Sequence, residues 1–111
     1  MLCRQWQREV VIRPPDRGRG GNAFQPEGRA AAACVQPLRG SLARQMYGQE
    51  PEQMRLMLCG LCAQPSAGDG VCVDVPPDAD PDFRVVWAAR WPGHWEAHLA
   101  LIPPAERGPD A

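Results

Sequence analysis

The fold is decided by residues 68–103, GDGVCVDVPPDADPDFRVVWAARWPGHWEAHLALIP, which predict three short β-strands joined by two turns. Hydrophobic and polar residues alternate through residues 83–91 and again through residues 94–102. Alternation with a period of two is typical of strands that bury one face. Pro92 and Gly93 suit the centre of a type II turn, because proline fixes φ and glycine accepts a positive φ. We therefore expect a hairpin with tryptophan on both strands.

The same alternation predicts which side chains of the hairpin face the core. On the first strand the inward set is expected to be Phe83, Val85, Trp87, Ala89 and Trp91. On the second strand it is expected to be Trp95, Ala97, Leu99 and Leu101, with Glu96 and His98 facing solvent. Before the hairpin, residues 71–75 form a strand with three valines on one face, and the Pro/Asp-rich residues 76–82 end it.

Three further strands are expected upstream of this stretch. The first covers residues 5–13, which end in a Val-Val-Ile run before two prolines. The second covers the alanine-rich residues 30–35, which are too few for a stable helix and lack a capping residue. The third covers residues 53–59, where Met54, Leu56 and Leu58 alternate with other side chains. Six short strands favour a small antiparallel β-barrel or sandwich.

The remaining segments are expected to be loops of a single domain. At 111 residues the chain is long enough for one modest core. Residues 14–28 are rich in glycine and poor in apolar anchors, so we expect a flexible loop. Residues 38–51 form a long polar connection between the second and third strands, too polar to contribute to the core. The polar tail at residues 104–111 is expected to fray.

Composition argues against several classes of function. The formal net charge is −1, although all twelve basic residues are arginine, so no basic excess marks a nucleic-acid-binding face. No apolar run approaches the about 18–20 residues of a membrane span, and the N-terminal residues lack the apolar region of a signal peptide. We therefore expect the five cysteines to be reduced thiols in a cytoplasmic compartment.

The motif CGLC at residues 59–62 brings two cysteines together, and two histidines follow downstream. Cys59, Cys62, His94 and His98 have the ligand chemistry of a tetrahedral zinc site. On one strand, however, histidines four residues apart are separated by roughly 13 Å, too far for one ion. A thioredoxin-like redox pair would need a helix at the cysteines, which the following proline and glycine prevent. We prefer small buried thiols and expect neither metal nor cofactor.

Two other candidate sites are weak. Asp74, Asp78, Asp80 and Asp82 are closely spaced, but the run lacks the sixth-position glycine and the closing glutamate of a calcium-binding EF-hand loop. We expect a solvated acidic turn. Neither histidine has a serine or cysteine partner in a recognisable nucleophile motif, and no glycine-rich loop opens a helix. The sequence therefore predicts a protein that is not an enzyme.

Several short motifs occur in a definite order along the chain. They are ACVQPLRG at 33–40, YGQE at 47–50, GDGV at 68–71, RVV at 84–86 and HWEAHL at 94–99. This order resembles the head-closure (stopper, head–tail connector) proteins of long-tailed bacteriophages. Their recurring pattern is Ala-x-Val-x-Pro-x-x-Gly, then Tyr-Gly-x-Glu, then Gly-Asp before a strand, then a closing hairpin. The C-x-x-C motif has no counterpart in that pattern.

The resemblance implies an SH3-like β-barrel that forms a homo-oligomeric ring in the neck of the virion, with about twelve or about six copies. Its implied partners are the portal or adaptor protein, a tail-completion or tail-tube protein, and the double-stranded DNA in the channel. The particle would assemble in the bacterial cytoplasm. Two alternatives stay open: a tail-completion or adaptor protein of the same neck, and a zinc- or thiol-dependent cytoplasmic binding protein.

The resemblance also implies a role for the long connection at residues 38–51. In this family the corresponding loop reaches into the channel and helps retain packaged DNA. The side chains expected to contact DNA, a neighbouring subunit or another partner are Arg39, Ser41, Arg44, Met46, Tyr47, Gln49 and Glu50.

Overall fold

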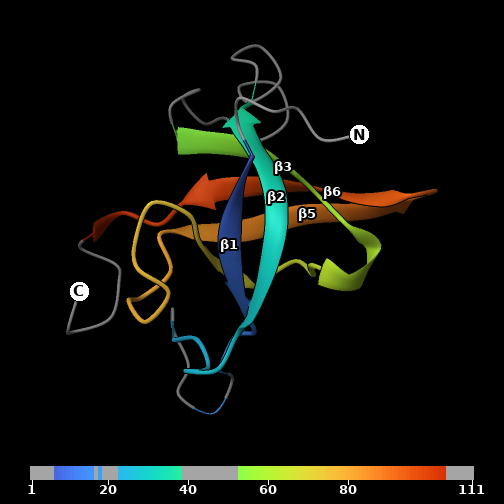
Figure 1. Cartoon of the computed structure of the whole chain (residues 1–111). Coiled ribbons are helices and arrows are strands. Elements are labelled where there is room, and N and C mark those ends of the chain that lie inside the picture. Colours follow the sequence, from blue (N-terminus) through green and yellow to red (C-terminus); the bar gives the residue numbers. More distant parts are fainter. Residues whose placement is uncertain (1–6, 17, 19–22, 39–52, 105–111) are drawn as a thin grey trace.

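The computed structural model describes residues 7–16, 18, 23–38 and 53–104, and the statements below concern these residues (Figure 1). Six antiparallel strands close into a barrel in the order β1-β2-β3-β6-β5-β4. The strands are β1 (Gln7–Arg13), β2 (Arg29–Pro37), β3 (Met54–Cys59), β4 (Gly70–Cys72), β5 (Phe83–Trp91) and β6 (His94–Leu101), with a short 3-10 helix η2 (Leu61–Ala63) after β3. The predicted all-β fold and its small closed barrel are confirmed.

The barrel interior is filled by aliphatic side chains and one aromatic ring. All six strands contribute to this core, whose largest members are Val10, Ile12, Val35, Met57, Val71, Phe83, Val85 and Leu99. Phe83 is the only aromatic residue of the described chain that is fully buried there. The guanidinium of Arg55 lies 5.2 Å from the centre of the Phe83 ring, which places a cation over its face.

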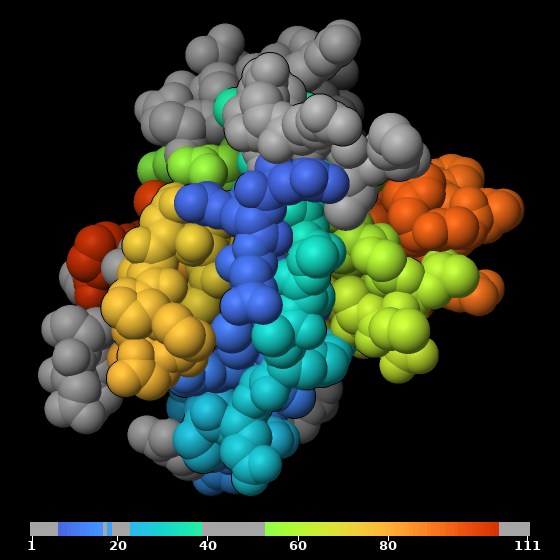
Figure 2. Space-filling view, in the orientation of Figure 1, coloured from blue at the N-terminus to red at the C-terminus, as the bar shows by residue number. Residues whose placement is uncertain are grey.

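The β5–β6 hairpin is the longest element and projects beyond the barrel (Figures 1 and 2). Trp91 pairs with His94, so Pro92 and Gly93 form the predicted two-residue connection. Gly93 has a φ of +96°, a value that favours glycine and fits the second central position of a type II turn. The hairpin was therefore placed correctly from its turn residues.

The facing of β5 was predicted correctly only for its first residues. Phe83 and Val85 are buried, but a bulge shifts the register between Val85 and Trp87. A bulge adds one residue to a strand, so every side chain beyond it changes face. Beyond Val86 it is Ala88 that packs against the core, and Trp91 is 46% exposed. The prediction that Trp87, Ala89 and Trp91 face inward is wrong for this reason.

β4 is shorter than predicted because a side chain replaces its strand partner. The Asp82 carboxylate accepts hydrogen bonds from the Val73 and Asp74 amides at 2.8 and 2.9 Å. These amides are thereby satisfied outside the sheet, and the strand ends at Cys72. Val73 still packs in the core. Asp82 is buried, so the prediction of a solvated acidic turn is wrong for that residue.

Beyond β1 and β2 the chain continues as an irregular two-stranded ribbon. The Asp16 amide donates to Ala23 O and the Gln25 amide to Pro14 O, each at 2.9 Å. The ring of Phe24 lies beneath the Arg84 guanidinium, 5.6 Å from it. Residues 14–16 and 23–28 therefore extend the β1–β2 pair, and the rest of this predicted flexible loop, apart from Gly18, lies outside the described residues.

Candidate functional site at the base of the long connection

The connection between β2 and β3 starts and returns at one fixed point. The Leu38 amide donates a hydrogen bond to Met54 O at 3.3 Å, across the end of the β2–β3 pair. Leu38 and Met54 are 3% and 0% exposed and form a small hydrophobic cluster separate from the barrel core, with Leu56 and Ala100 packed against it. Leu38 therefore anchors the segment that we predicted to be too polar for any core.

This cluster continues along the outer face of the sheet. Residues paired directly across antiparallel strands share a face. The cross-strand pairs join Met54 to Ala100, Leu56 to His98 and Leu58 to Glu96, while His98 and Glu96 pair on their other side with Trp87 and Ala89. These eight residues of β3, β6 and β5 form what we call the outer-face strip. It runs from the base of the long connection toward the hairpin tip.

His98 lies in the middle of the strip and is only 4% exposed, so its prediction as a solvent-facing residue is wrong. Its ring is stacked at a tilt on Trp87, with 4.6 Å between the ring centres. Its Nε2 lies 3.5 Å from Glu96 Oε2, and Glu96 Oε1 accepts a hydrogen bond from Trp91 Nε1 at 3.1 Å. Glu96 therefore connects the buried histidine to the exposed tryptophan near the hairpin tip.

The strip was missed because we assigned one buried face to each strand. The residues of β3 carried a signal that could have revealed it, since Leu56 and Leu58 alternate with the equally apolar Met57 and Cys59. A strand that is apolar at both odd and even positions is typical of burial on both faces. β3 follows that rule, with Met57 and Cys59 inside the barrel and Leu56 outside.

The loop residues predicted to make functional contacts lie outside the described residues. They are Arg39, Ser41, Arg44, Met46, Tyr47, Gln49 and Glu50. Their roles stay predictions, and only the base from which their segment starts and returns is described.

The four residues of the zinc alternative are not brought together. Cys59 lies in the barrel core and Cys62 is exposed on η2, whereas His98 lies on the outer-face strip and His94 at the hairpin turn. In the described part of the chain no group of three or more His, Cys, Asp or Glu side chains is arranged to hold a metal ion. Cys34 is disulfide-bonded, so the prediction of reduced thiols throughout is wrong for that residue.

Both buried free thiols have a raised pKa. Burial raises the pKa of Cys59 to about 11, and the nearby Arg29 guanidinium offsets this only in part. Burial also raises the pKa of Cys72, against the opposing effect of Arg13. Because only the thiolate is nucleophilic, neither buried sulfur is suited to redox exchange at neutral pH.

We expect iodoacetamide at mildly alkaline pH to alkylate Cys62 and to leave Cys59 and Cys72 unmodified, because only Cys62 is exposed. Peptide mass spectrometry after a timed reaction measures this directly. The urea-unfolded chain is the control, in which all three thiols should react. Equal labelling of Cys59 and Cys62 in the folded chain would contradict the placement of Cys59 in the core.

The segment between η2 and β4 is held against β2 by one arginine. Arg29 donates from Nε to Ala63 O and from a terminal nitrogen to Gln64 O, each at 2.8 Å. The same guanidinium lies 3.8 Å from the carboxylate of Asp69, which also accepts from the Ser66 amide at 3.0 Å. Burial raises the pKa of Asp69, and the Ser66 hydrogen bond and the Arg29 charge offset it only partly.

This shift predicts a pH dependence of stability. A carboxyl whose pKa is raised on folding stabilises the folded chain at pH values below its unfolded pKa, and that contribution is lost as the pH rises through the folded pKa. Asn at position 69 does not titrate. We therefore expect Asp69→Asn to gain stability relative to the native chain between acid and neutral pH, as measured by urea unfolding. If Asp69→Asn instead lost stability relative to the native chain as the pH rises, the ion pair with Arg29 would outweigh the effect of burial on the Asp69 carboxyl.

Comparison with known proteins gives no relative for this chain: no family model, curated protein or solved structure matches it. Among the described residues, no helix has the length and apolar character needed to cross a membrane.

Proposed function

We propose that this protein is a structural component of the neck of a long-tailed bacteriophage. It forms a homo-oligomeric ring between the portal or adaptor protein and the tail, and it helps to close the DNA channel after packaging. The observation that carries this proposal is the fixed base of the long connection, Leu38 and Met54, on a small closed barrel. The order of motifs shared with head-closure proteins supplies the functional class.

The length of the connection supports a functional role. β2 and β3 are antiparallel neighbours, and such pairs are usually joined by about two to five residues. Here residues 38–53 lie between them. Loops that exceed the structural need usually carry function, and a rigid base gives such a loop a defined starting position. A loop that narrows a channel needs that defined position, because the channel radius is set by the ring.

The charges of the barrel wall also suit a channel through which DNA must slide. Most described arginines are engaged within the chain. Arg8 bonds to Asp74, Arg13 to Pro77 O and Arg29 to the loop after η2, while Arg55 and Arg84 lie over aromatic rings. Lys and Arg contacts to phosphates hold nucleic acid strongly at physiological salt. A wall whose cations are already engaged offers few such contacts.

The experiment that tests the proposal is assembly on purified portal–adaptor complexes. We expect the added chain to form a ring of extra density at the tail-facing end of those complexes, visible by electron microscopy. The portal without its adaptor is the matched control and should bind less. Absence of binding at saturating concentration, together with stoichiometric zinc in the purified chain, would favour the zinc-dependent alternative instead.

A further inference from the structure

The β5 side of the β5–β6 hairpin is unpaired toward its end, because β4 stops early, whereas β3 stays paired with β6 as far as Trp95. β4 pairs with β5 only at Phe83 and Arg84. The contact extends to Val85, whose carbonyl accepts a hydrogen bond from the Gly68 amide and whose amide donates to Asp69 O, each at 2.8 Å. From Val86 to Trp91, β5 has β6 as its only strand partner among the described residues. Figure 2 shows this end of the hairpin protruding at one side of the molecule, next to the segment that contains η2.

Trp91 is the most exposed large hydrophobic residue that the structure describes, at 46%. Its indole nitrogen is bonded to Glu96 Oε1, which orients the ring. The remaining exposed part is apolar surface with a fixed direction. Aromatic rings of this kind supply large contact area at low conformational cost, which is why they are enriched at protein interfaces.

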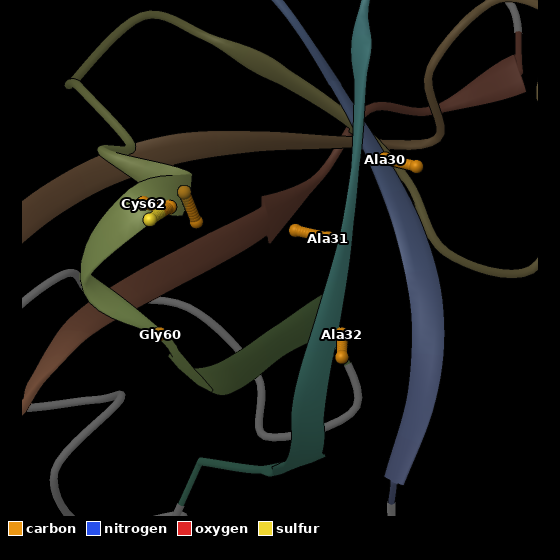
Figure 3. Close-up of a pocket in the computed structure, with 6 residues that line it drawn as sticks. Ala30, Ala31, Ala32, Gly60 and Cys62 are labelled. Atoms are coloured by element: carbon orange, nitrogen blue, oxygen red, sulfur yellow. The ribbon is translucent and has the colours of Figure 1, made fainter.

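A hollow of about 360 Å³ lies elsewhere on the same molecule, between β2 and η2 (Figure 3). It is lined by small residues, namely Ala30, Ala31, Ala32, Gly60, Cys62 and Ala63. The hollow exists because β3 pairs with β2 only as far as Ala33, after which the chain leaves the sheet at Gly60. Ala30–Ala32 are left with β1 as their only described strand partner.

The hollow and the hairpin tip complement each other in size and charge. The volume is at the lower end of the range of about 300–1,000 Å³ for binding pockets, which suits one ring system. Glu9 is exposed and pairs across from Ala32 at the edge of the hollow, while Arg90 is exposed beside Trp91. Within the described residues neither charge has an ionic partner.

We propose that the hairpin tip of one copy, led by Trp91, inserts into the β2–η2 hollow of a second copy. The inserted surface and the receiving surface differ, so the contact is head to tail and repeats from copy to copy. Such contacts generate rings when the rotation closes and open filaments when it does not. The inference deepens the proposed function by naming the surfaces through which neighbouring copies touch. The closed ring rests on the proposed function, whereas the contact does not.

The contact should be weak for an isolated pair of copies. A buried aromatic residue removes about 150–250 Å² of surface from water, whereas stable interfaces bury about 800 Å² per partner. We therefore expect a monomer at micromolar concentration and association at millimolar concentration or on a template that holds copies side by side. In the native chain, amide signals of Ala30–Ala32 and Gly60 and the indole signal of Trp91 should shift together on concentration.

Cys62 provides a native reporter for the contact, because its free and exposed thiol lines the hollow. Pro92→Cys places a second thiol at the hairpin tip and leaves Trp91 intact. Under mild oxidation at millimolar concentration we expect a ladder of disulfide-linked dimers, trimers and larger species. A head-to-tail contact produces a ladder, whereas a symmetric contact between two tips stops at the dimer.

Three further variants complete the test. Adding Cys62→Ser to Pro92→Cys should abolish the ladder. Adding Gly60→Leu should reduce it several-fold by filling the hollow, and folding should persist because a Cβ at Gly60 meets no atom within 4 Å. Val86→Cys is the matched control, an exposed thiol on the same hairpin away from its tip, and should give no ladder.

A ladder no stronger than that of Val86→Cys, or dimers that persist with Cys62→Ser, would overturn the proposed contact. These measurements use the purified chain alone, so a negative result rejects the contact between copies and leaves the proposed role in the phage neck to its own test. A strong ladder from a chain that ignores portal–adaptor complexes would keep the contact and reject the function.

Discussion

Particles in which a short Gly/Ser linker replaces residues 41–49 should lose their packaged DNA or fail to join tails. Their infectivity should fall to that of particles lacking the protein. The barrel itself should be unaffected, because Leu38 and Met54 close the base of the connection outside the replaced residues. The purified variant should therefore keep its β-type circular dichroism and its urea unfolding midpoint.

A replacement of residues 105–111 by Gly and Ser is the matched control for this experiment. It changes a comparable number of residues at the end of the chain, and we expect normal infectivity. Particles with the shortened connection that retain DNA, join tails and infect normally would reject the channel-closure role, even if the protein were still found at the neck.

Phe83→Ala should have the largest effect on stability, about 3–5 kcal/mol, the usual range for a large aromatic core truncation. Phe83 is 1% exposed and lies in the barrel core beneath the Arg55 guanidinium. The substitution leaves a cavity that the closed barrel can only partly collapse around. Urea unfolding followed by circular dichroism measures the loss.

Val86→Ala is the control for Phe83→Ala and should change stability by no more than roughly 0.5 kcal/mol, as at ordinary surface positions. Val86 sits at the bulge and is 37% exposed. If Val86→Ala were the costlier change, Val86 rather than Phe83 would face the core, and the facing of the first residues of β5 would be wrong by one residue.

The positions of the strands could be read from the sequence because they depend on local signals. Prolines, glycines and aspartates mark the strand ends, and the turn at Gly93 requires the positive φ that its sequence predicts. β5 was predicted with its observed bounds, Phe83–Trp91. Alternation alone could not show the bulge at Val86, since a single extra residue depends on how neighbouring strands pair.

The parts that sequence analysis missed depend on contacts between distant residues. Val73 and Asp74 leave the sheet because Asp82, eight or nine positions away, takes their amides. His98 is buried because Trp87 changes face at the bulge and stacks on it. The long connection was recognised from its length and motifs, but its anchoring by Leu38 and Met54 required the register of β2 against β3.

The shortness of β4 means that the closed barrel has one weak seam. β4 makes three residue pairs with β1 and two with β5, whereas β5 and β6 pair along their whole lengths. Local opening proceeds where the fewest interactions must break, so the seam can part before the chain unfolds. What then remains is a curled sheet of five strands, β1-β2-β3-β6-β5. The loop base, the outer-face strip and the projecting hairpin all belong to that sheet, so the barrel can open along one side while its contact surfaces keep their shape.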